Sequence, residues 1–325
     1  MSLRTFTLPG ISLELPPLGF GCSALTGTSR RNALQLLDAV FESGVRHFDV
    51  ARYYGYGESE GILGTFARSR RTQITITSKF GIQPPSRKSS LRLIISFGRR
   101  FVRMVPAARK IAQSRANFLV TTPPFTASEC KRSLETTLRE LRTDYLDFFL
   151  LHDYGVTNAH HEELLAFLEG AVKEGKVRFF GIGTAFNEVL SAVKSQPELC
   201  RIVQFENSAL VKNVFNFHSP TTELLITHGS LGNSYRRLLS LLKSKRDLAK
   251  HWSLKMGADC SSEDILAALM LNYAVSVNSR GMVLFSSRNA ARAVKNVESV
   301  FQSRFTAEQM SIFGDLTETL AMLDP

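Results

Sequence analysis

The chain has 325 residues, a length that suits two average domains or one α/β barrel, and 44% of its residues are hydrophobic, enough to bury a full core. Its net charge of +11 is confined to one region. Residues 61–128 hold 13 Lys and Arg and no acidic residue, while the rest of the chain has a net charge of −2. This confinement argues against a generally basic nucleic-acid-binding protein.

Targeting and metal-binding patterns are also missing from the sequence. The first residues lack the apolar run of a signal peptide, and no stretch reaches the ~18 uncharged apolar residues of a membrane-spanning helix. The four cysteines lie far apart and show no metal-ligand spacing. We therefore expect a soluble cytoplasmic protein with reduced thiols, no integral membrane span, no metal site and no nucleic-acid partner.

Strand and helix signals alternate along the chain. Short apolar, β-branched or aromatic runs predict strands at 16–22, 47–51, 73–79, 143–153, 177–183, 201–207, 223–227 and 281–286. Apolar stripes at helical spacing predict helices at 29–43, 58–67, 126–141, 161–174, 186–195, 234–247, 262–275 and 289–300. Short strands separated by helices at this period predict a parallel sheet, and eight of them predict closure into a (β/α)8, or TIM, barrel. We expect one domain over 1–325, with a helical C-terminal segment at 302–325.

One long insertion, residues 82–126, follows the third predicted strand. Within it, residues 91–104 interleave apolar side chains with arginines, which predicts an amphipathic basic helix. Three interpretations stay open. The helix packs on the barrel rim with its arginines solvated, it forms a lid over a substrate, or the basic stretch 87–115 meets an acidic partner or an anionic surface.

Polar residues stand at or just after the ends of the second, third and fourth predicted strands. These are Asp49, Tyr54, Lys79 and His152. A (β/α)8 barrel carries its active site at the carboxyl ends of its strands. Such a set suits carbonyl reduction by hydride transfer, in which the product alkoxide needs a proton. A phenol titrates near ~10, so we expect the Lys79 ammonium to lower the pKa of Tyr54, with Asp49 keeping Lys79 charged and His152 orienting the carbonyl.

The order and spacing of these residues resemble the aldo-keto reductase family. Its motif Asp-x-Ala-x-x-Tyr-Gly, followed by a Lys and then a His at the ends of the next two strands, is matched by Asp49, Ala51, Tyr54, Gly55, Lys79 and His152. Further similarity lies at 57–64, 173–183 and 203–210. Each residue alone also has a structural explanation, such as a helix cap or a surface charge, but the four together favour a site.

The resemblance implies a dinucleotide laid across the barrel mouth. It assigns the nicotinamide end to Thr184 and Gln204, although the family's Ser-Asn pair is replaced by Gly183 and Thr184. The loop after the seventh strand would contribute His228 in place of an aromatic ring, followed by Gly229, Ser230 and Leu231. The adenosine and 2′-phosphate end would meet Ser286, Ser287, Arg288, Arg292 and Asn296. A helix N-terminus with arginines suits a phosphate, which favours NADP(H).

The sequence therefore predicts an NADP(H)-dependent oxidoreductase that reduces an aldehyde or ketone, or oxidises the corresponding alcohol or sugar, with Tyr54 as general acid and base. Asp153 either reaches a substrate hydroxyl or caps the following turn. Two alternatives stay open. One is a non-catalytic NADPH-binding redox sensor that engages a partner through the basic insertion, and the other is an enzyme that acts on lipid-derived carbonyls at a membrane surface.

Overall fold

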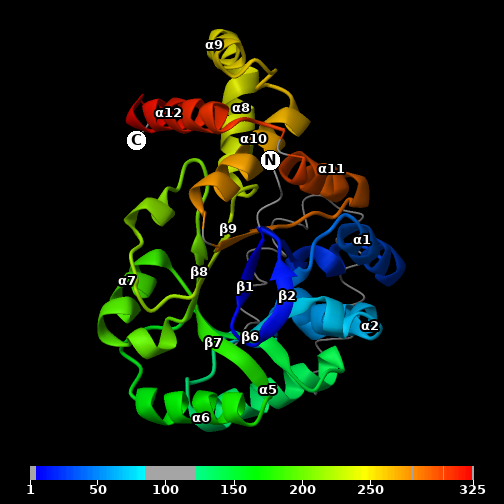
Figure 1. Ribbon diagram of the computed structural model, residues 1–325, viewed down its shortest axis with the longest axis vertical. Coiled ribbons are helices and arrows are strands. Elements are labelled where there is room, and N and C mark those ends of the chain that lie inside the picture. Colours follow the sequence, from blue (N-terminus) through cyan, green and yellow to red (C-terminus); the bar gives the residue numbers. More distant parts are fainter. Residues whose placement is uncertain (1–4, 85–121, 280, 303, 324–325) are drawn as a thin grey trace, which may run out of the picture.

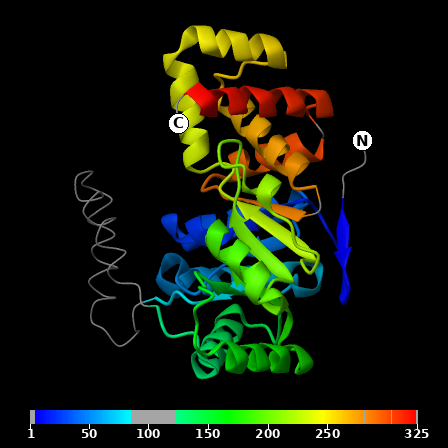
Figure 2. The same ribbon diagram turned by 90° about the vertical axis from the view of Figure 1, so that its left-hand side faces the viewer.

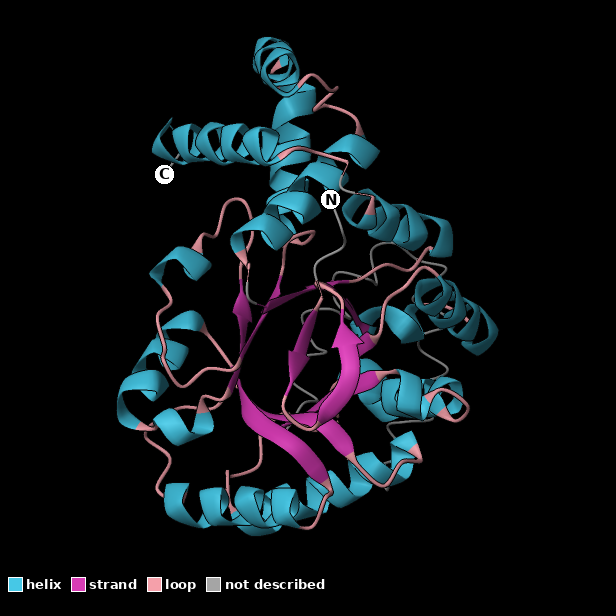
Figure 3. Cartoon of the chain, viewed as in Figure 1, coloured by secondary structure: helices cyan, strands magenta, loops and turns pink. Residues whose placement is uncertain are grey.

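Eight parallel strands close into a barrel, as the sequence predicts (Figure 3). The computed structural model describes residues 5–84, 122–279, 281–302 and 304–323. The barrel strands are β3 (Leu18–Gly21), β4 (His47–Asp49), β5 (Thr75–Phe80), β6 (Leu146–His152), β7 (Val177–Gly183), β8 (Ile202–Glu206), β9 (Leu224–His228) and β10 (Gly281–Phe285). Each pairs in parallel with its sequence neighbour, and β10 pairs with β3 to close the ring. The basic helix predicted at 91–104 and the surface predicted at 87–115 lie outside the described residues.

Helices surround the strands on the outside of the barrel. They are α1 (Arg30–Glu42), α2 (Glu58–Ala67), α5 (Ala127–Leu141), α6 (His161–Lys173), α7 (Phe186–Ser195), α8 (Asn233–Ser244), α9 (Arg246–Met256), α10 (Glu263–Val277), α11 (Ala290–Phe301) and α12 (Ala307–Leu323). Side chains cap α1 and α11 at their N-termini. The Ser29 hydroxyl accepts from the Asn32 amide of α1 at 3.2 Å, and the Asn289 side chain accepts from the Arg292 amide of α11 at 2.9 Å. α12 confirms a helix in the C-terminal segment.

Two features of the fold differ from the sequence prediction. The single helix expected at 234–247 is two helices, because Lys245 leaves the helical backbone between α8 and α9 without a glycine or proline to mark the break. An N-terminal hairpin, β1 (Phe6–Leu8) and β2 (Ile11–Leu15), was not predicted. Its strands are short, and its turn relies on Gly10 with a φ of +78°.

The barrel interior is packed at its amino-terminal end. Inward-facing side chains of five strands form one apolar cluster with the hairpin: Phe148, Leu150, Phe179, Ile202, Leu224, Ile226, Met282 and Leu284 with Leu8, Ile11 and Leu15. The hairpin crosses that end of the barrel (Figures 1 and 2). Apolar residues thus close this end of the barrel interior, and the open cavity lies at the opposite, carboxyl-terminal end.

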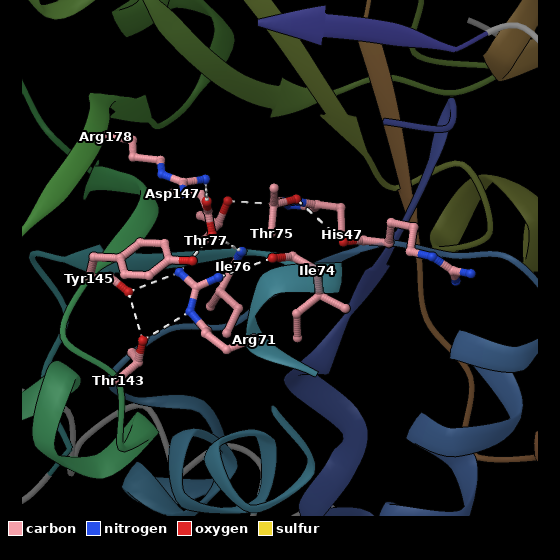
Figure 4. A network of polar contacts seen from close by, with 11 residues as sticks. His47, Arg71, Ile74, Thr75, Ile76, Thr77, Thr143, Tyr145, Asp147 and Arg178 are labelled. Carbon is pink, nitrogen blue, oxygen red and sulfur yellow. Dashed lines mark hydrogen bonds and ion pairs between the residues drawn. The ribbon is translucent and has the colours of Figure 1, made fainter. Parts of the chain in front are cut away.

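Outward-facing side chains at the amino-terminal end hold β5, β6 and β7 together (Figure 4). Asp147 is fully buried, and its oxygens accept from Arg71 at 2.8 Å, Arg178 at 2.8 Å and the Ile76 amide at 2.8 Å. Both guanidinium groups also lie over the Tyr145 ring, at 3.7 Å and 4.5 Å from its centre. Two arginines and a backbone amide thus share the buried carboxylate.

A second apolar cluster lies beside the barrel, where α8, α9, α10 and α12 gather at one end of the molecule (Figure 2). Trp252, Phe313 and Tyr273 form its centre, with edge-to-face ring contacts at 5.9 Å and 5.6 Å. This cluster supports α8 and α10, which flank the second of the two cavities described below.

Candidate active site

A cavity of about 590 Å³ opens at the carboxyl ends of the barrel strands. The last residues of seven strands line it: Gly21, Asp49, His152, Gly183, Glu206, His228 and Phe285. Tyr54 joins them from the short η2 helix (Tyr54–Gly57) after β4. Asp49 and His152 therefore lie at strand ends, as the sequence predicts, and their side chains line the same cavity as Tyr54.

Asp49 and Lys79 form a buried ion pair at the base of the cavity. Each is 2% exposed, and Lys79 Nζ donates to Asp49 Oδ1 at 2.5 Å and to the Val50 carbonyl at 3.3 Å. The second carboxylate oxygen, Oδ2, accepts from Gln204 Nε2 at 3.0 Å. Because strand residues alternate, β4 and β5 turn Asp49 and Lys79 inward while Phe48 and Ser78 point to the helices. A buried charge needs such compensation to stay ionised.

Tyr54 lies above this pair. The Lys79 ammonium is 5.4 Å from the centre of the Tyr54 ring, in a cation–π arrangement. Tyr53, which the sequence reasoning missed, lies edge-on to Tyr54 at 4.8 Å and tilted against His152 at 5.4 Å between ring centres. Its place beside Tyr54 in an aromatic pair was the signal available in the sequence. Tyr53 thus connects the two predicted catalytic side chains.

The pKa of Tyr54 differs from expectation. Burial, followed by the negative charge of Asp49, raises the pKa of the phenol well above its ordinary value of 10.0. The expectation of a lowered pKa is wrong in this structure, because burial of the ring and the nearby Asp49 charge both disfavour the phenolate. The phenol therefore keeps its proton at neutral pH, which is the form that a proton donor needs.

His152 is a neutral imidazole at physiological pH. Burial and then the Lys79 charge lower its pKa to about 3. Its Nδ1 atom is buried and, among the described residues, has no hydrogen-bond partner. A neutral ring has one N–H donor and one acceptor nitrogen, so His152 can donate a hydrogen bond to an oxygen in the cavity.

The residues predicted for the nicotinamide end lie around the same cavity, with one exception. Thr184, Gln204, His228, Gly229 and Leu231 line it, whereas Ser230 is buried and lies outside the described lining. Gly183 leaves room here, since a Cβ atom would lie 3.2 Å from Gln204 Oε1. Lining residues that the sequence reasoning did not single out include Ser23, Tyr53, Phe186, Glu206 and Asn213.

A second cavity, of about 360 Å³, adjoins the first through Leu231 and Ser286. Its lining contains the residues predicted for the phosphate and adenine: Ser286, Ser287, Arg288, Arg292 and Asn296. They gather where α11 begins, so the helix N-terminus and two guanidinium groups face one space. In the described part of the chain, neither Arg288 nor Arg292 forms an ion pair with a carboxylate. Glu263 and Asp264 of α10 also line this second cavity.

Other kinds of site were sought across the described residues. No cluster of three or more His, Cys, Asp or Glu side chains could hold a metal ion there. No helix in that part of the chain is long and apolar enough to cross a membrane. The four cysteines are free and buried.

The fold and the cavity define a (β/α)8 barrel protein with a polar site at the carboxyl ends of its strands. A model of the aldo/keto reductase family matches residues 17–216, and the chain belongs to that family. An aldo-keto reductase from Bacillus halodurans in its holo form has a TM-score of 0.72 at 20% identity, with 97% of this chain and 96% of that chain covered. For an aldo-keto reductase from Klebsiella pneumoniae in complex with NADPH, the TM-score is 0.68 at 18% identity, over 98% and 96%.

Curated relatives match a shorter part of the chain. The D-threo-aldose 1-dehydrogenase of a Pseudomonas species is 27% identical over 203 residues, which are 58% of this chain and 55% of that protein. The chain spans about half the length of the curated relatives it matches.

Proposed function

We propose that the protein is an NADP(H)-dependent oxidoreductase that reduces an aldehyde or ketone to an alcohol, or oxidises an alcohol or sugar in the reverse direction. The observation that supports this most directly is the arrangement of Tyr54, His152 and the buried Lys79–Asp49 pair around one cavity. Family membership supports the same reaction class. The proposed location is the cytoplasm, where NADPH is available to a reductase.

In this proposal, bound NADPH supplies the hydride that adds to the carbonyl carbon. His152 donates a hydrogen bond to the carbonyl oxygen and holds it beside Tyr54. As negative charge develops on that oxygen, the Tyr54 hydroxyl transfers its proton there and the alcohol forms. The phenolate left on Tyr54 lies within the field of the Lys79 ammonium, 5.4 Å from its ring centre. Asp49 holds that ammonium in place through their ion pair.

The cofactor residues follow from the two adjoining cavities. Thr184 and the free carbonyl oxygen of Gln204 would hold the nicotinamide carboxamide, and His228 would lie against the ring. Gly229, Ser230 and Leu231 would contribute backbone to the passage between the cavities. Ser287, Arg288 and Arg292 would bind the 2′-phosphate by charge-assisted hydrogen bonds, with Ser286 and Asn296 nearer the ribose and adenine.

Hydroxylated carbonyl compounds, such as sugars, suit the mouth of the cavity. Asp153, Glu206 and Asn213 line it and offer hydrogen-bonding groups for substrate hydroxyls. Tyr53 and Phe186 add aromatic faces on which a sugar ring can pack. The related D-threo-aldose 1-dehydrogenase is named for an aldose, which supports the same substrate class.

The test is NADPH oxidation, followed by absorbance, with a panel of aldehydes and aldoses. We expect turnover in the wild-type protein and a loss in Tyr54→Phe on the order of 100-fold or more, since general acid catalysis contributes that much. Tyr145→Phe, at the opposite end of the barrel, is the matched control, and its rate of NADPH oxidation should equal that of the wild-type protein. Full activity in Tyr54→Phe would contradict the mechanism. Tight NADPH binding without turnover of any carbonyl would instead favour the non-catalytic sensor.

A further inference from the structure

Glu60, in the first turn of α2, is fully buried behind the cavity wall. Both of its carboxylate oxygens are engaged. Oε1 accepts from the Ser78 hydroxyl at 2.8 Å and from the Thr137 hydroxyl at 2.8 Å. Oε2 forms an ion pair with Arg52, whose side chain is 13% exposed. Each of these contacts is costly to break, because its loss would leave a buried polar or charged group without a partner. Glu60 therefore holds its three partners in fixed positions.

The partners of Glu60 lead directly to the proposed catalytic groups. Arg52 lies two residues before Tyr54 in the loop after β4, and Ser78 directly precedes Lys79 in β5. Because side chains alternate along a strand, Ser78 points outward to Glu60 while Lys79 points inward to Asp49. Glu60 therefore joins the loop that carries Tyr54 to the strand that carries Lys79, and Thr137 fixes both against α5.

The loop held by Arg52 has an unusual backbone. Gly55, Tyr56 and Gly57, directly after Tyr54, all have left-handed φ angles, of 59°, 59° and 87°. A tyrosine rarely adopts this conformation, which persists only where the surrounding structure holds it. On one side of the loop Gly55 lies so close to Thr26 that a Cβ atom would overlap it. The Arg52–Glu60 pair provides the second anchor.

We infer that Glu60 is a positioning residue that fixes Tyr54 relative to Lys79 through Arg52 and Ser78. This rests on the proposed function, in which those two side chains carry the proton transfer. The described lining of the cavity includes neither Glu60 nor Arg52, so the effect passes through the loop and not through contact with substrate. The catalytic rate depends steeply on the positions of the reacting atoms, and a displacement near 1 Å lowers that rate on the order of 100-fold.

Glu60→Gln tests this inference with little change of shape. The glutamine carbonyl still accepts from Ser78 and Thr137, but its amide group faces the Arg52 guanidinium and the ion pair is lost. We expect kcat to fall on the order of 10- to 100-fold while the Kd for NADPH stays within about twofold. Arg52→Lys should keep more of kcat than Arg52→Gln, since the lysine retains the charge.

Arg178→Gln is the matched control. It also removes an arginine from a fully buried carboxylate, that of Asp147, but at the amino-terminal end of the barrel. It should lower stability and leave kcat within about twofold of the wild-type value. A kcat loss of the same size in Arg178→Gln and Arg52→Gln would overturn the inference, because general destabilisation would then explain both.

Hydrogen exchange supplies a readout that does not depend on turnover. In Glu60→Gln we expect faster amide exchange in residues 50–57 and unchanged exchange in residues 146–152. Unchanged exchange at 50–57, or a kcat within about twofold of wild type, would overturn the inference. Tyr54→Phe is measured in parallel. If that variant is fully active, the proposed function fails, and the exchange at 50–57 still decides whether Glu60 holds the loop. If Glu60→Gln does not fold, the Arg52→Lys and Arg52→Gln pair decides.

Discussion

Arg288 carries the choice between NADPH and NADH in the proposed site. It lines the second cavity beside the start of α11 and forms no ion pair with a described carboxylate. We expect Arg288→Ala to weaken NADPH binding by about 1.5–3 kcal/mol, the usual contribution of a hydrogen bond to a charged group, which is on the order of 10- to 100-fold in Kd. NADH binding should change little. Fluorescence titration with both dinucleotides measures this, with Arg304→Ala as a control beyond α11. Equal weakening for both dinucleotides would remove Arg288 from the 2′-phosphate site.

Single residues were predictable where they interrupt an apolar pattern. Asp49, Lys79 and His152 each stand in or at the end of a buried run, so their convergence followed from the barrel alone. The pKa of Tyr54 was not predictable, because it depends on how deeply the assembled site buries the ring and how near it brings the Asp49 charge. The same holds for Ser230, whose burial is decided by packing around it and not by its own sequence context.

Asp147 links the amino-terminal ends of β5, β6 and β7, so we expect it to contribute to the free energy of unfolding. We expect Asp147→Asn to lower the free energy of unfolding by about 3–5 kcal/mol, because two buried or half-buried arginines lose their counter-charge. Urea denaturation followed by circular dichroism measures the change. Glu223→Gln, which removes an exposed pair with Arg201, is the control and should cost at most about 1 kcal/mol. Equal urea midpoints for Asp147→Asn and Glu223→Gln would contradict the prediction, because the buried Asp147 ion pairs would then contribute no more to stability than the exposed pair.

Elements were predictable where apolar residues recur at helical spacing, as in the helices expected at 29–43 and 289–300. They were missed where tertiary contacts override the local pattern. The hairpin β1–β2 is stabilised by Leu8, Ile11 and Leu15 against the barrel interior, which no local signal reveals. Likewise, the ion-pair and hydrogen-bond partners of Asp147 are residues 71, 76 and 178, which lie far from it in the sequence. This network therefore forms only in the assembled sheet and was not predictable from the local pattern.

The overall architecture was predictable because eight alternating strand and helix units can close in one way that buries every strand face. The packing of α8, α9, α10 and α12 into a second cluster was not, since it depends on contacts such as that of Trp252 with Phe313. Substrate specificity likewise depends on the loops around the mouth of the cavity, and their arrangement was not predictable from the sequence pattern alone.

Two histidines with lowered pKa values make the stability of the whole molecule depend on pH. Burial lowers the pKa of His47 from 6.5 to about 4 and that of His152 to about 3. His47 is fully buried between the hydroxyls of Thr75, at 2.9 Å, and Thr77, at 3.2 Å. The unfolded chain therefore binds more protons below pH 6.5, so the stability is complete above that pH and is lost as the pH falls through 6.5 toward 4. The raised pKa of Asp147 opposes part of this loss.

For His47 alone the loss approaches about 3 kcal/mol at pH 4, from 1.36 kcal/mol per pKa unit. Urea midpoints at pH 7 and pH 5 should differ in the wild-type protein. That difference should shrink in His47→Gln, which has no titrating ring, and stay unchanged in the exposed control His160→Gln. Titration of the imidazole proton signals by NMR gives both pKa values directly. A His47 pKa near 6.5 would contradict the prediction, because the folded and unfolded states would then bind protons equally.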